Sequence, residues 1–119
     1  MITPASVAKQ VIVLEPNGRL TAETVDEFNR SVSNWVRRGW HDVILDLQHV
    51  TYLDSAGIGV LAQLHLSSQR RGSRAVFVNV AGKNRELLRV TKLLTVFEVY
   101  DSTGDAARSF ARRPQPVTC

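Results

Sequence analysis

The chain has 119 residues and a mass of 13.2 kDa, of which 44% are hydrophobic and 22% charged. This size and apolar content predict a single domain over residues 1–111 with one core, followed by a flexible tail at 112–119. The one cysteine, Cys119, excludes a disulfide framework and a cysteine-based metal centre, so a reducing, cytoplasmic setting is expected. Neither a basic leader with a long apolar core nor a run of 18 apolar residues occurs, so we expect neither export nor membrane insertion.

Positive charge is concentrated in the second half of the chain. Residues 1–60 carry five Lys/Arg against seven Asp/Glu, whereas residues 61–119 carry ten against four. Such a surface suits nucleic acid, anionic lipid or an acidic protein, but some of these cations are also placed where they would favour helix C-termini. Nucleic-acid binding is not expected, because base-reading motifs and interleaved aromatic residues are absent. The residues concerned are Arg70, Arg71, Arg74, Lys83, Arg85, Arg89 and Lys92.

The first elements alternate between β and helical patterns. A β-branched run at 11–14 predicts a strand, preceded by a short edge strand at 7–9 and followed by the turn residues of PNG. Apolar residues between Thr21 and Gly39 then recur at helical spacing. With acidic residues early and arginines late, this pattern predicts an amphipathic helix with Thr21 as its N-cap and Gly39 as its stop.

The remaining pattern completes an α/β fold. The nearly continuous apolar run at 43–47 predicts a central strand that is covered on both faces. We expect a mixed, mostly parallel sheet of about five strands and about four helices, with helices after strands two to five. The later elements expected are a helix ending at 70–72, a strand at 75–80, a helix at 84–94, a strand at 96–100 and a short helix capped by Ser102 and Asp105.

The segment DSAGIGVLAQL, residues 54–64, places two glycines in the first turn of a helix. Each glycine costs the helix roughly 1 kcal/mol relative to alanine, so the bare backbone there needs an explanation. One explanation is an accessible helix N-terminus that a partner or an anion approaches closely. The other is tight packing of helix against sheet, with ordinary capping by Asp54 or Ser55.

Catalytic constellations are weak in this sequence. GIGVLA matches the dinucleotide fingerprint, but it is not in a first βαβ unit, and the strand that should supply an acidic residue supplies Asn79. His41, His49 and His65 lack the spacing of metal ligands, and neither a nucleophile elbow nor a phosphate-binding loop occurs. We therefore expect no enzyme activity, no catalytic residue, no metal and no cofactor.

The run VILDLQHVTYLDSAGIGVLAQL resembles the central motif of STAS domains, which occur in bacterial anti-sigma-factor antagonists and in the cytoplasmic tails of sulfate transporters. The resemblance extends over residues 7–111 and includes NGRLT and KLLTVFEVYDS. It implies the STAS arrangement of sheet and helices. It also implies a regulatory, non-enzymatic protein-interaction module.

The resemblance implies that this protein acts by partner switching, as anti-sigma-factor antagonists do. The unmodified antagonist binds an anti-sigma factor that is also a serine kinase, phosphorylation separates the two, and a serine phosphatase restores the binding form. Carried over to this sequence, the partner-binding surface comprises Thr21, Asp54, Ser55, Ala56, Gly57 and Ile58. Ile58 is expected to act as an apolar anchor if its side chain is exposed.

Two positions depart from the commonest antagonist motif. Ala56 stands where the usual phosphoacceptor hydroxyl would be, and Thr21 stands where an acidic residue often occurs. Ser55, one residue earlier, is then either an alternative phosphoacceptor or only a helix cap. In the second case the chain is a STAS subunit that docks constitutively in another assembly, such as a lipid-transport ATPase complex or a stress-signalling scaffold.

Overall fold

A computed structural model describes residues 2–8, 11–39 and 42–111, with side chains described from residue 11 onward. The expected tail at 112–119 and the last residue of the expected edge strand, Lys9, lie outside the described residues. The strands are β1 (Ile2–Ala8), β2 (Val11–Pro16), β3 (Gly18–Leu20), β4 (Asp42–Asp46), β5 (Val50–Leu53), β6 (Ala75–Val78) and β7 (Glu98–Tyr100). The helices are α1 (Val25–Arg37), α2 (Ser55–Arg70), α3 (Gly82–Val90), the 3₁₀ helix η1 (Leu93–Thr95) and α4 (Thr103–Ala111).

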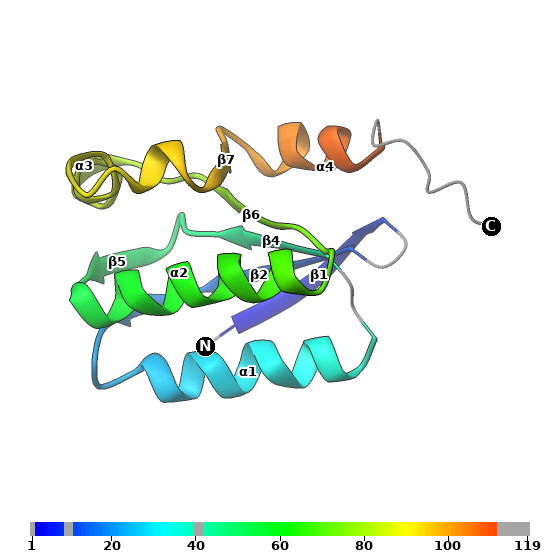
Figure 1. The fold of residues 1–119 in the computed structure, drawn as a ribbon, viewed down its shortest axis with the longest axis horizontal. Helices are drawn as coiled ribbons and strands as arrows, with labels where there is room; N and C mark the ends of the chain where they lie inside the picture. Colours follow the sequence, from blue (N-terminus) through cyan, green and yellow to red (C-terminus); the bar gives the residue numbers. More distant parts are fainter. Residues whose placement is uncertain (1, 9–10, 40–41, 112–119) are drawn as a thin grey trace.

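The main sheet has five strands in the order β1-β2-β4-β6-β7 (Figure 1). Only β1 runs antiparallel to its neighbour, and the other pairs are parallel. All five residues of β4 are buried, as its apolar sequence predicts for a strand covered on both faces. The predicted α/β class, the central strand and the helix that follows each of the last four strands are thereby confirmed.

A second, two-stranded sheet was not predicted. β3 pairs in parallel with β5, with Gly18 opposite Val50 and Leu20 opposite Leu53. Both strands are too short for alternation of apolar and polar residues to reveal them, and their pairing joins segments about thirty residues apart. This small sheet brings the turn before α1 to the start of α2.

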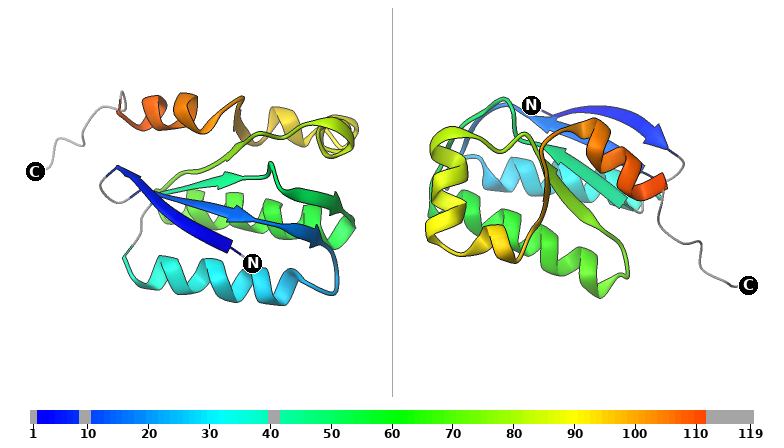
Figure 2. Two further views of the ribbon diagram at one scale, coloured as in Figure 1. Left: turned by 180° about the vertical axis from the view of Figure 1, so that it is seen from behind. Right: turned by 90° about the horizontal axis from the view of Figure 1, so that it is seen from above.

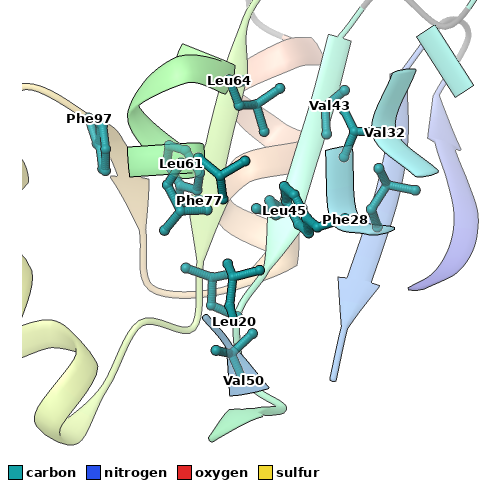
Figure 3. Packing of buried hydrophobic residues seen from close by; sticks show 14 of the residues in the cluster. Leu20, Phe28, Val32, Val43, Leu45, Val50, Leu61, Leu64, Phe77 and Phe97 are labelled. Atoms are coloured by element: carbon teal, nitrogen blue, oxygen red, sulfur yellow. The ribbon is translucent and has the colours of Figure 1, made fainter. Parts of the chain in front are cut away.

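The core lies on both faces of the main sheet. On one face α1 and α2 run side by side, and Phe28 and Leu61 of these helices join Leu45 and Phe77 of the sheet (Figures 1 and 3). The other face is covered by α4 (Figure 2). Phe110 of this helix belongs to a second cluster with residues of β2, β4 and β6. Because helices pack on both faces of the sheet, the N-terminus of each helix is held in a fixed position relative to the ends of the strands.

Several predicted boundaries needed correction. Thr21 is not the N-cap of α1: a turn at 21–24 precedes the helix, and the N–H of Thr21 donates to Oγ1 of Thr24 at 2.9 Å. The predicted helix at 84–94 divides into α3 and η1, because Lys92 adopts a left-handed conformation with φ +68° between them. The last strand also starts later than expected, at Glu98. The predicted stop at Gly39, with φ +97°, is confirmed, as is the hydrogen bond from Asp105 N to Ser102 Oγ at 3.1 Å.

One residue of the basic segment has a structural role. Arg74 bonds to the Glu98 carboxylate through Nε at 3.0 Å, and its NH2 group donates to Ser109 Oγ at 3.0 Å. Its guanidinium also lies 4.2 Å from the centre of the Phe110 ring. The hydrogen bond to Glu98 raises the pKa of Arg74, so its positive charge is used to hold β6, β7 and α4 together.

The two glycines of α2 have different surroundings. A Cβ added at Gly57 would lie 2.1 Å from the carbonyl oxygen of Leu20, which no real contact allows. A Cβ added at Gly59 would meet nothing within 4 Å. Tight packing on β3 therefore explains Gly57, whereas Gly59 leaves open space beside the helix backbone, as the explanation by an accessible helix N-terminus requires.

The two alanine variants should change stability in opposite directions. Gly57→Ala is expected to lower the free energy of unfolding by about 1–3 kcal/mol, because α2 or β3 must move. Gly59→Ala should raise it by up to about 1 kcal/mol through helix propensity. Urea unfolding of both variants measures this difference, and equal stabilisation by both would show that α2 does not press on β3.

Candidate functional site

Asp54 joins the beginning of α2 to the turn before α1. Its carboxylate accepts the N–H of Gly57 at 2.9 Å through Oδ1 and the N–H of Ala22 at 3.1 Å through Oδ2. Asp54 N also donates to the carbonyl of Leu20 at 3.4 Å. The N-cap of α2 is thus Asp54 and not Ser55, which settles the capping alternative left open by the sequence.

These hydrogen bonds act on the ionisation of Asp54. Donation by the backbone N–H of Gly57, with smaller help from Ala22, holds the pKa of this carboxyl below its ordinary value of 3.8. The group is therefore ionised at neutral pH, and its negative charge sits at the positive end of the α2 dipole.

Ser55, the first residue of α2, has an exposed side chain. Its hydroxyl forms no hydrogen bond to any residue that the structure describes. Gly59 and Leu66 follow four and eleven residues later, so all three lie on one side of the helix. Leu66 is 47% exposed, and we call these three residues, Ser55, Gly59 and Leu66, the open face of α2.

The other expected contact residues lie deeper. Ile58 is half-buried and packs against the core, and Ala56 is also half-buried. Gly57 is buried, and Thr21 is only 4% exposed. The expectation that Thr21 lies on the contact surface is therefore wrong. Its side chain is buried beneath the turn, where Oγ1 accepts the N–H of Glu23 at 3.3 Å. Exposed Ala22 and Glu23 take its place at the surface.

The second sheet extends the accessible surface beside Asp54. Tyr52 of β5 is 48% exposed, and the guanidinium of Arg19 from β3 lies 4.8 Å from its ring centre. Neither residue was singled out from the sequence, since their contact depends on the unpredicted pairing of β3 with β5. Gly59 and Leu66, in contrast, follow from helical spacing counted from Ser55.

Asn79 and His65, which were considered for catalysis, make contacts within the fold. Asn79 donates through Nδ2 to Oδ1 of buried Asp46 at 3.0 Å, so it ties the end of β4 to the end of β6. His65 packs its ring 5.5 Å from that of Phe97. Within the described residues, no cluster of three or more His, Cys, Asp or Glu side chains is arranged to hold a metal ion. None of the described helices is long and apolar enough to cross a membrane.

Neutralising Asp54 should alter the pH dependence of stability. Because the folded-state pKa is lowered, the carboxylate stabilises the fold above its ordinary pKa of 3.8, and this contribution is lost as pH falls through the lower folded-state value. Asp54→Asn is expected to be less stable than the parent at pH 7, and the difference should shrink below about pH 4. Thermal unfolding over this range measures it, and a difference that is the same at all pH values would contradict the assigned hydrogen bonds.

Comparisons with known proteins agree with the fold. A model of the STAS domain family matches residues 4–106. A Thermotoga maritima protein provisionally named an anti-sigma factor antagonist is 25% identical over 111 residues, covering 92% of this chain and 98% of its own.

Solved structures show the same architecture. The crystal structure of a Thermotoga maritima protein with the same provisional name superimposes with a TM-score of 0.86, at 24% identity over 93% of this chain and 95% of that one. The Bacillus cell fate determinant SpoIIAA, solved in its phosphorylated form, gives a TM-score of 0.71 at 18% identity over 94% of this chain and 100% of that one. The chain belongs to the STAS domain family and is an anti-sigma factor antagonist-like STAS domain.

Proposed function

We propose that this protein is an anti-sigma factor antagonist that binds an anti-sigma factor with serine kinase activity in the cytoplasm. The partner is expected to contact the open face of α2 together with the adjoining turn at Ala22 and Glu23. Similarity to relatives named as antagonists supports this role. In it, the protein serves as ligand and as kinase substrate, and it catalyses no reaction itself.

The observation that carries this proposal is the bare surface at the start of α2. Ser55 and Gly59 are exposed one turn apart, and no side chain lies where a Cβ of Gly59 would be. A partner can therefore approach the helix backbone closely at this point. Leu66 offers exposed apolar area further along the same side, which is the kind of contact expected of Ile58 from the sequence.

Phosphorylation of Ser55 is the regulatory step of this proposal. The kinase transfers the γ-phosphoryl group of ATP to Oγ of Ser55, which loses its proton, and ADP is released. The phosphoryl group adds about −1.5 to −2 charge at pH 7 next to the ionised carboxylate of Asp54. A partner fitted to a small neutral hydroxyl would then face concentrated negative charge and dissociate, and hydrolysis by a serine phosphatase would restore the binding form.

A second candidate function rests on Ala56. This residue has no hydroxyl at the position where antagonists of this family usually carry the acceptor. Without phosphorylation, the same open face would dock constitutively in another assembly. The lipid-transport ATPase complexes and stress-signalling scaffolds that contain STAS subunits are the candidates.

A bulky side chain at Gly59 should block docking. Gly59→Arg is expected to weaken affinity for the anti-sigma factor at least ten-fold, or about 1.4 kcal/mol, without harming the fold, since arginine is a good helix former. The matched control is Gln69→Arg, which adds the same side chain at an exposed position ten residues further along α2. Isothermal titration calorimetry on both variants checks the surface, and equal affinities would place docking elsewhere.

Phosphorylation of Ser55 can be tested separately from docking. After incubation with the anti-sigma factor and ATP, mass spectrometry should find one phosphoryl group, mapped to Ser55. Ser55→Ala should accept none, whereas Ser33→Ala, which removes an exposed hydroxyl on α1, should behave like the parent. Tight binding without any phosphorylation would favour constitutive docking and refute the role of Ser55 as acceptor.

A further inference from the structure

A groove between α1 and α2 is not used by the proposed function. It has a volume of about 540 Å³ and is lined by Phe28, Asn29, Arg30, Val32, Ser33, Val36, Arg37, Gln63, Leu64, Ser67 and Arg71. The lining includes the last residue of α1 and the C-cap of α2, so the groove extends to the C-terminal ends of the two helices, which run side by side (Figure 1). Ser55 and Gly59 are not part of it.

The groove is positively charged along its rim. Arg30, Arg37 and Arg71 line it, and none of its lining residues is acidic. Within the part of the chain that the structure describes, Arg30 and Arg37 form no ion pair, and the only hydrogen bond of the Arg71 side chain is donated to Ser73 Oγ at 3.5 Å. Arg37 and Arg71 lie at the C-terminal ends of α1 and α2, where the helix dipole favours a positive charge. This effect does not explain Arg30, which lies in the middle of α1.

The remaining lining residues suit a small polar ligand. Asn29, Ser33, Gln63 and Ser67 supply neutral hydrogen-bonding groups between the arginines. The floor is closed, since Phe28 is fully buried and Val32 and Leu64 are only 7% and 8% exposed. A partner protein, which typically buries about 800 Å² on each side of an interface, would find little apolar surface there.

We propose that this groove binds a small organic polyanion that carries phosphate or carboxylate groups. Its volume falls in the range of about 300–1,000 Å³ that is usual for small-molecule sites. Arg30 and Arg37 are two turns apart on α1, about 10 Å along the helix axis, with Arg71 on the opposite helix. Arginine side chains placed in this way can bind separate anionic groups of one ligand. Each guanidinium group binds a phosphate or a carboxylate through a pair of hydrogen bonds.

Two simple anions test the groove. Pyrophosphate and citrate, titrated into ¹⁵N-labelled protein at constant ionic strength, stand for the phosphate and the carboxylate forms of the ligand. For at least one of them, saturable shifts are expected for the amides of residues 29–37 and 63–71, and the anion that binds more tightly identifies the anionic group. If neither anion gives saturable shifts at about 10 mM, the proposal is overturned. A dissociation constant of that size corresponds to about 2.7 kcal/mol of binding free energy.

Charge-matched variants separate a built site from general attraction. Arg30→Gln combined with Arg37→Gln should weaken binding at least ten-fold, since both substitutions remove charged hydrogen-bond donors to the anion. Lys83→Gln combined with Lys92→Gln removes the same charge from exposed positions on and after α3, and should leave affinity within two-fold. Equal weakening in both pairs would mean an adventitious ion only and would refute the site.

Discussion

The close approach of α2 to the carbonyl of Leu20 is the constraint on which the rest of the site depends. Only a residue without a Cβ fits at Gly57, and the Asp54 carboxylate then bridges Gly57 and Ala22. The beginning of α2, the turn before α1 and the small β3–β5 sheet are thereby held as one unit. Ser55 and Gly59 are exposed in this arrangement, because the opposite side of α2, at Gly57, packs against β3.

The two glycines of α2 have different roles in the structure. Gly57 belongs to the packing of helix on strand, and Gly59 to the surface. A capping carboxylate at Asp54 satisfies the helix N-terminus, so the Ser55 hydroxyl is not needed for that purpose. Ser55 can therefore be modified without removing the hydrogen bond that starts the helix.

Much of the fold was predictable because its signals are local. The apolar run of β4, the helical stripe of α1 and the Ser102 cap of α4 each depend on residues close together in the sequence, and each is confirmed. The pairing of β3 with β5 was missed because it joins two very short strands from distant segments. The placement of Thr21 was wrong for a related reason: a threonine before an amphipathic run looks like a cap, and only the tertiary structure shows that Thr24 ends the turn.

The candidate site remains a prediction, and the structure changes which of its residues are accessible. Leu66 was missed, although its helical spacing from Ser55 could have found it. The burial of Thr21 and the contact of Arg19 with Tyr52 depend on the second sheet and had no local signal. The groove between α1 and α2 had no signal in the sequence, since arginines near helix ends are ordinary and the gap between two helices is a property of their packing.

The most direct measurement of the central claim is an amide-shift map of the ¹⁵N-labelled protein in complex with its anti-sigma factor. If the partner docks at the beginning of α2, the largest changes are expected at residues 22–23, at residues 52–59 and on the exposed side of α2 as far as Leu66. Changes confined to α4 and the edge strand β1, with the beginning of α2 unaffected, would contradict it.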